Sequence, residues 1–223
     1  MKKFLITHIT VLAFLSSIFS GCTDFKQLSE PHYGSGRIST QNRNVSECSS
    51  INIRYSGDVI LTQDNTQSVL VEADNNLIDD VITQADNGVL SVGLQSGNYK
   101  DATIKIYISL KTIKEISING AGNVTIQNKI DGDDLSCIIN GAGDIYLNGA
   151  YNNLDCLING AGNINAFDLV AISCTASISG TGNCSVDATE SLNASIQGIG
   201  NITFDGNPTV KSTVSGIGKV SHR

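Results

Sequence analysis

A six-residue pattern built on two glycines recurs in the second half of the chain and restricts its possible folds more than any other feature. The pattern reads INGAGN at residues 118–123 and has drifted to VSGIGK at residues 214–219. Successive copies are separated by 21, 19, 20, 18 and 18 residues. Self-similarity at about 20 residues is typical of stacked structural units. The paired glycines are Gly120 and Gly122, Gly141 and Gly143, Gly160 and Gly162, Gly180 and Gly182, Gly198 and Gly200, and Gly216 and Gly218.

Apolar residues alternate with polar residues on both sides of each glycine pair. Two residues before the first glycine stand Ile118, Ile139, Ile158, Ile178, Ile196 and Val214. Four residues after it stand Val124, Ile145, Ile164, Cys184, Ile202 and Val220. A period of two predicts strand, turn and strand in every repeat, with one buried face. Stacked repeats align equivalent strands in parallel, and parallel crossovers are right-handed. We therefore predict an all-β fold, a right-handed parallel β-helix (β-solenoid) of 18–21 residues per repeat.

The glycine pair is interpreted as a structural corner, and its residue types supply no catalytic group. We expect positive φ there and too little room for a Cβ atom between adjacent rungs. The residue after the second glycine tolerates the left-handed region and can hydrogen-bond from rung to rung. This predicted ladder contains Asn123, Asp144, Asn163, Asn183 and Asn201.

A second frame lies upstream of the repeats and carries a family resemblance. It consists of VSECSSI at 45–51, GDV at 57–59, SVLVEAD at 68–74, NLI at 76–78 and NGVL at 87–90. Together with the glycine repeats, residues 44–223 resemble the head GIN domain family of bacterial envelope proteins. The resemblance implies a pectin-lyase-like solenoid with an adhesive or structural role and no established catalytic residues. Within this upstream region, alternation predicts strands at 51–55, 59–63, 69–73, 89–94 and 104–110, a tight turn at 86–88, and a helical turn or irregular strand at 76–85.

The first residues read as an export signal. Lys2 and Lys3 precede an apolar run at residues 4–19 that ends in FSGC. This end resembles the lipobox of bacterial lipoproteins of the Bacteroidetes kind, which implies cleavage before Cys22 and a diacylglycerol on its thiol. A transmembrane anchor or plain secretion is the alternative. The predicted organisation is a signal peptide at 1–21, a lipidated cysteine and flexible tether at 22–43, N-terminal β rungs that form a cap at 44–115, and the repeat solenoid at 116–223.

Charge and residue types exclude several classes of function. Loss of residues 1–21 leaves 12 basic and 21 acidic residues, a net charge of −9, so a nucleic acid partner is not expected. We expect no cofactor and no metal, because the acidic position of the glycine motif is Asp in only one copy. Asp131, Asp133 and Asp134 are predicted to form a solvated turn, and no carboxylate pair of the glycosidase kind is readable.

The cysteines outside the signal region fall in apolar positions. Cys137 and Cys156 occupy equivalent places in neighbouring repeats, so a strained disulfide between them is the alternative to free buried thiols. Buried thiols are predicted at Cys48, Cys137, Cys156, Cys174 and Cys184.

The aromatic residues suggest a contact surface. Tyr146 and Phe167 are predicted to point outward on adjacent rungs, with Tyr151 in the turn nearby. Such residues can stack on sugars or contact a protein, and ordinary surface aromatics are the alternative. The last repeat should expose a strand edge that pairs with another molecule, end-to-end self-association included, or that is blunted by Lys219, His222 and Arg223.

These observations predict a non-enzymatic outer-membrane lipoprotein of the bacterial cell envelope that serves adhesion, surface structure or scaffolding. The membrane is expected as a partner through the lipid, and a glycan or another envelope or host protein through the solenoid. A protein that binds or cleaves polysaccharide, or a periplasmic module that binds a protein, is the alternative. Whether the domain faces outward or into the periplasm is left open.

Overall fold

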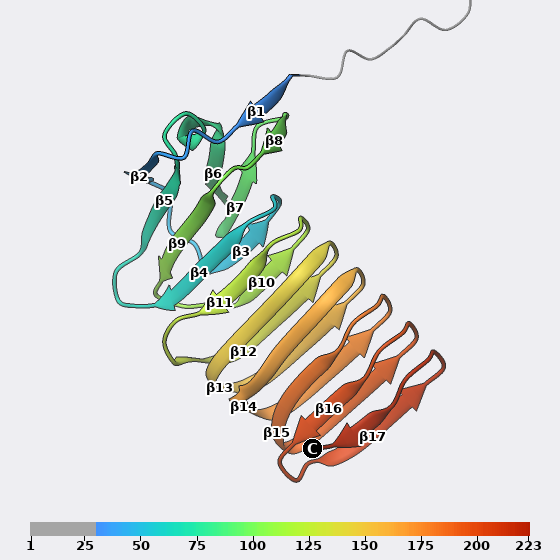
Figure 1. Ribbon diagram of the computed structural model, residues 1–223. Coiled ribbons are helices and arrows are strands. Elements are labelled where there is room, and N and C mark those ends of the chain that lie inside the picture. Colours follow the sequence, from blue (N-terminus) through green and yellow to red (C-terminus); the bar gives the residue numbers. More distant parts are fainter. Residues whose placement is uncertain (1–29) are drawn as a thin grey trace, which may run out of the picture. The chain divides into compact units, whose positions relative to one another are not determined.

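The computed structural model describes residues 30–223, and Pro31–Arg223 form one compact unit. The signal peptide and the predicted lipidation of Cys22 lie outside the described residues. The unit is a β-solenoid of about 5 turns (Figure 1), and no helix within residues 30–223 is long and apolar enough to cross a membrane. Its first half contains β1 (Pro31–Tyr33), β2 (Ile38–Asn42), β3 (Ser50–Ile53), β4 (Asp58–Gln63), β5 (Ser68–Asp74), the 3-10 turn η1 (Ile78–Asp80), β6 (Val81–Asp86), β7 (Val89–Leu94), β8 (Asn98–Lys100) and β9 (Ile104–Leu110). The repeats form β10 (Glu115–Ile118), β11 (Asn123–Ile126), β12 (Ile130–Ile139), β13 (Ala142–Ile158), β14 (Ala161–Ile178), β15 (Cys184–Ile196), β16 (Ile202–Asp205), β17 (Thr209–Val214) and β18 (Val220–His222).

Equivalent positions of the repeats pair in parallel register, which confirms the predicted solenoid. β12 pairs with β13, β13 with β14, and β14 with β15, and in each case the isoleucine two residues before the glycine faces its counterpart. This column of side chains is fully buried and contains Ile139, Ile158, Ile178 and Ile196. Because each repeat hides its apolar face only against its neighbours, the stack forms one continuous core.

The prediction of a flexible tether at residues 22–43 is wrong for residues 31–42, which contain β1 and β2. β1 pairs in parallel with β8, and β2 pairs antiparallel with β5. The connection is fixed by the buried carboxylate of Asp74, which accepts hydrogen bonds from the backbone N–H of Gly36 at 2.7 Å and of Thr103 at 2.8 Å. Sequence gave little sign of this because edge pairing uses backbone groups and needs no apolar alternation. Residues 22–29 lie outside the described part of the chain.

The upstream strands confirm the predicted ones to within a few residues. Asn87 and Gly88, at φ 49° and 78°, form the predicted tight turn between β6 and β7. The segment 76–85 contains both predicted forms, since η1 leads directly into β6. The cap is more mixed than a set of wide rungs, because β5–β9 and β6–β7 are antiparallel.

The prediction of buried free thiols is confirmed for the five cysteines of residues 30–223. Cys137 and Cys156 are register partners, yet both thiols remain free. Parallel strands in register aim the two Cβ atoms in the same direction, which opposes a bridge. Burial raises the pKa of the Cys137 thiol, so this side chain behaves as a small apolar group.

Candidate functional site

Glycine is required at the corners chiefly because a side chain has no space there. A Cβ atom on Gly160 would overlap the carbonyl oxygen of Gly141 in the preceding rung, and one on Gly143 would overlap that of Gly122. Left-handed φ values occur at only some second glycines, for example 149° at Gly143. The expected positive φ is therefore not shared by every corner. Close approach of the carbonyl from the previous rung is the common cause.

The predicted asparagine ladder is present along the outer edge of these corners. Asn163 donates from its backbone N–H and from Nδ2 to Asp144 Oδ1, both at 2.8 Å. Asn183 donates in the same two ways to Asn163, at 3.0 and 3.1 Å. Asn201 and Asn123 continue the row in either direction, and it begins at Asp58, which accepts from Asn123 Nδ2 at 3.1 Å. None of these ladder residues has positive φ, so the ladder forms without the left-handed conformation that they can tolerate.

A second amide ladder was missed in the sequence. Asn119 donates to Asn52 at 2.8 Å, Asn140 to Asn119 at 3.0 Å, and Asn159 to Asn140 at 2.9 Å. The signal that could have revealed it is the asparagine directly before the first glycine in three successive copies. The amides of Asn140 and Asn159 keep a second N–H for solvent or a ligand, whereas Asn119 also donates to Ser117 Oγ at 3.0 Å. The corner is thus flanked by two rows of side chains held in fixed positions.

The three aromatic residues proposed as one contact surface do not share a surface. Tyr146 is 44% exposed, and its hydroxyl donates to Asp144 at 3.3 Å. Its register partner is Asn165, and a register shift follows Tyr146, so Phe167 does not stack beside it. Phe167 is half-buried beneath Arg223, whose guanidinium carbon lies 4.8 Å from the ring centroid.

Tyr151 is a core residue, which corrects its prediction as a ligand contact. It is only 3% exposed, and its hydroxyl donates to the carbonyl oxygen of Ile113 at 2.9 Å. Gly132 on the preceding rung makes room for the ring, because a Cβ atom there would lie 2.6 Å from the Tyr151 Cε1 atom. The turn assumed at residues 131–134 is also wrong: all four residues belong to β12, although the three carboxylates are solvated as predicted.

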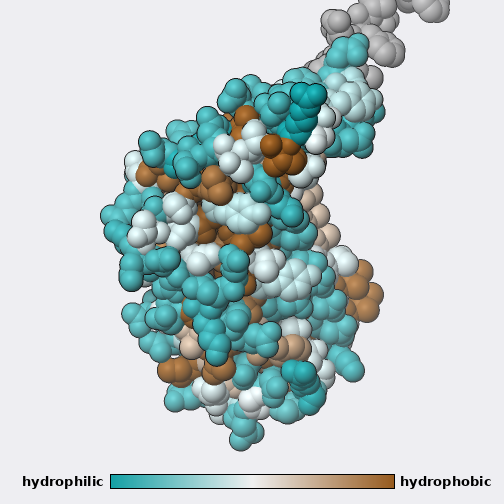
Figure 2. All heavy atoms as spheres, turned by 60° about the vertical axis from the view of Figure 1, so that its left-hand side comes forward, coloured by the Kyte–Doolittle hydropathy of each residue, from teal (hydrophilic) through white to brown (hydrophobic). Residues whose placement is uncertain are grey.

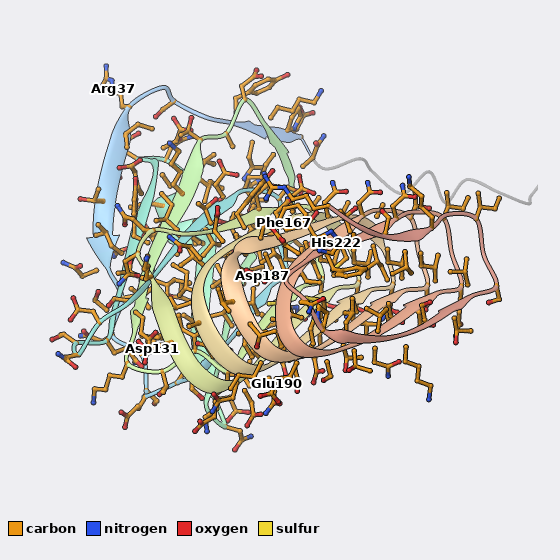
Figure 3. The ribbon with its side chains drawn as sticks, turned by 90° about the horizontal axis from the view of Figure 1, so that it is seen from below. Arg37, Asp131, Phe167, Asp187, Glu190 and His222 are labelled. Atoms are coloured by element: carbon orange, nitrogen blue, oxygen red, sulfur yellow. The ribbon has the colours of Figure 1, made fainter. Side chains whose placement is uncertain are left out.

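A polar and aromatic cluster that the sequence did not reveal lies beside the last rungs (Figure 3). Asp187 and Asp205 are register partners, and Arg223 lies 3.8 Å from Asp205. Burial and the neighbouring Asp205 charge raise the pKa of Asp187. His222 packs edge-on against Phe204 at 5.1 Å, and its Nε2 lies 2.9 Å from the Gly206 carbonyl oxygen.

The final strand edge is only partly covered. His222 and Arg223 fold against neighbouring rungs, as the blunting prediction expected, whereas Val214 and Ile217 are 45% and 70% exposed. Pairing of this edge with another molecule stays a prediction.

Comparison with known proteins gives a consistent result. The family model described as putative auto-transporter adhesin, head GIN domain, matches residues 47–208. A putative adhesin from Bacteroides fragilis is 24% identical, with a TM-score of 0.71, over 86% of this chain and 100% of that chain. A putative lipid binding protein from Parabacteroides distasonis is 23% identical with a TM-score of 0.60, over 87% of this chain and 100% of that chain. A putative adhesin from Parabacteroides merdae is 20% identical with a TM-score of 0.53, over 87% and 100%. These likenesses show the fold, and no curated protein matches the sequence.

Proposed function

The chain belongs to the head GIN domain family, and we propose that it is a lipid-anchored protein of the bacterial envelope whose solenoid is a non-enzymatic surface for adhesion or scaffolding. The observation that carries this proposal is the pair of amide ladders, which hold outward polar side chains in fixed rows over several rungs. A surface held in place loses little conformational entropy on binding. Figure 2 shows a largely hydrophilic face with separated apolar patches, as a polar recognition surface requires.

A non-enzymatic role is supported by how the candidate catalytic groups are used. His32 lies 3.6 Å from Asp80 in the cap, and both ring nitrogens of His222 contact backbone carbonyl oxygens. The buried thiols have no access to a substrate, and burial raises the pKa of the Cys137 thiol. The amide side chains of the two ladders hydrogen-bond to one another and do not ionise, so they cannot act as general acids or bases.

Anchoring through Cys22 would hold the domain close to the membrane. Only residues 23–30 separate this cysteine from Pro31, where β1 begins. Eight residues span at most about 28 Å when fully extended. The start of β1 would therefore lie within about 28 Å of the lipidated cysteine.

Polysaccharide binding or cleavage is the second candidate, and one observation favours it. Asp187 has a raised pKa, whereas its register partner Asp205 is held by Arg223 and by the Gly206 N–H at 2.8 Å. Two neighbouring carboxylates in unlike environments are the arrangement used by many glycosidases. Release of reducing ends from envelope polysaccharides by the wild-type protein, and its loss in Asp187→Asn, would support this candidate over the first.

Protease treatment of intact source cells tests the proposed function, with a periplasmic protein as the control. Loss of the solenoid from intact cells supports adhesion, whereas protection until lysis supports an internal scaffold. The Cys22→Ser variant should leave the membrane fraction and enter the soluble fraction. Retention of this variant in the membrane would contradict the lipid anchor.

A further inference from the structure

Three successive rungs form a groove on the outer side of the coil. Asp131 of β12, Ala150 of β13 and Val170 of β14 are register partners across it. The groove has a volume of about 550 Å³. Figure 3 shows Asp131 and Glu190 along the same side of the coil, away from Arg37 in the cap. The lining residues are Asp131, Gly132, Asp133, Ala150, Tyr151, Asn152, Val170 and Ile172.

The hollow follows from the small side chains in the middle of this surface. Ala150 contributes a methyl group, and Gly132 contributes no side chain, because the ring of Tyr151 occupies the space beneath it. Asn152 donates to Asp133 Oδ1 at 2.8 Å, which fixes that carboxylate at the rim. One wall therefore carries two carboxylates, and the opposite wall carries two aliphatic side chains.

The wall formed by Val170 and Ile172 is aliphatic although both side chains point outward and are exposed. Val170 and Ile172 are each 42% exposed. Burial of such side chains by a partner is favourable because it removes apolar surface from water. Their pairing with a polar wall indicates a ligand that combines apolar and charged parts.

The groove lies in a part of the chain that contains carboxylates and no Lys, Arg or His. Within residues 30–223 the ion pairs are His32–Asp80, Lys111–Glu47 and Arg223–Asp205, so neither Asp131 nor Asp133 belongs to one. Lys111 and Lys129 line the adjacent hollow beyond Asp131, which sets the boundary of the anionic surface. The acidic residues between 130 and 210 are Asp131, Asp133, Asp134, Asp144, Asp155, Asp168, Asp187, Glu190 and Asp205.

We propose that this groove binds an extended segment of a partner protein that presents Lys or Arg side chains beside aliphatic ones. A Lys or Arg side chain has an apolar stem that can pack on Val170 and Ile172, and a cationic head that can reach Asp131 and Asp133. Charge complementarity selects a cationic segment over an acidic one and speeds its encounter with the groove. This inference names the class of partner for the adhesion or scaffolding role and rests on that role.

The test uses the full chain purified in detergent micelles and three rhodamine-labelled hexapeptides, made of alternating Lys-Val, Lys-Ser or Glu-Val. Fluorescence anisotropy should show binding in the order Lys-Val, Lys-Ser, Glu-Val, weakened by added salt. Asp131→Asn with Asp133→Asn should raise the Kd for the Lys-Val peptide about tenfold. Asn at residue 133 can still accept the hydrogen bond from Asn152, so the rim is preserved.

A matched control removes the same charge elsewhere. Asp79→Asn with Asp155→Asn alters two exposed carboxylates outside the groove and should change the Kd less than twofold. Val170→Ser with Ile172→Ser should make the Lys-Val peptide bind no better than the Lys-Ser peptide. Equal loss in the control and groove variants, or no preference for Lys-Val over Glu-Val, would overturn the proposal. Since the assay uses purified protein, it can fail while the protease and fractionation results stand.

Discussion

The glycine corner makes a quantitative prediction about stability. Gly160→Ala places a methyl group on the carbonyl oxygen of Gly141 and within 2.7 Å of the Asn140 carbonyl carbon. Both obstacles are backbone atoms of the preceding rung, so no side chain can rotate away. The two rungs must separate at this corner.

The expected loss follows from the contacts broken by that separation. Two backbone hydrogen bonds cross the rungs here, from Gly160 N–H to Ile139 and from Ala161 N–H to Gly141, both at 2.9 Å. Each contributes about 1 kcal/mol net, and residual backbone strain adds about 1–2 kcal/mol. Gly160→Ala should therefore lower the free energy of unfolding by about 3–4 kcal/mol.

Gly93→Ala is the matched control because its new methyl group would find its nearest atom, Arg54 Cβ, at 3.9 Å. Removal of a flexible glycine should leave stability unchanged within about 0.5 kcal/mol or raise it slightly. Urea unfolding followed by far-ultraviolet circular dichroism measures both variants, and Gly160→Ala should lower the midpoint by about 1 M or more. Equal midpoints for the two variants would refute the steric explanation of the corner.

Four further predictions use the same unfolding assay or simple chemistry. Asn163→Ala should lose about 1–2 kcal/mol because it removes one donor and one shared acceptor from the ladder, whereas Asn193→Ala, at an exposed position, should change little. Tyr151→Phe should also lose about 1–2 kcal/mol, because the buried carbonyl of Ile113 would lack its donor; an unchanged midpoint would mean that water replaces the hydroxyl. Folding raises the pKa of Asp187 above its ordinary value of 3.8, so ionisation of this carboxyl opposes folding. The free energy of unfolding should therefore fall as pH rises from 3.8 through the raised pKa. Asp187→Asn should remove this dependence and be stabilising at neutral pH. Thiol reagent should find the five described cysteines unreactive in the native protein and all of them reactive after denaturation without reductant; a deficit of two thiols would reveal a disulfide.

The solenoid itself could be predicted because every level of the sequence supports it. Alternation defined the strands, and the glycine interval aligned Ile139, Ile158 and Ile178 in one column. The ladder of Asn163 and its neighbours followed from the same alignment. The same strand–turn–strand pattern occurs six times, so the buried positions of the core could be predicted from the sequence alone.

The parts that could not be predicted depend on single, unrepeated contacts. β1 and β2 attach through backbone edges and the buried carboxylate of Asp74, which leave no periodic trace. Tyr151 has the residue type of a surface aromatic, and it turns inward because Gly132 on the preceding rung has no side chain in its way. The insertion after Ala166 shifts the register of β14 and moves Phe167 away from Tyr146.

The two amide ladders give the coil a direction. In every side-chain link the amide of the later rung donates and the oxygen of the earlier rung accepts, from Asn201 back to Asp144 in one row and from Asn159 back to Asn52 in the other. The side-chain dipoles therefore add along the axis instead of cancelling, much as peptide dipoles add in a helix. Asp58 terminates one row with a carboxylate that can only accept while ionised, and Asp144 interrupts the relay because it has no amide to pass on. The two ends of the solenoid therefore differ electrically. An elongated ligand that lies along the axis would meet a different surface if its own direction were reversed.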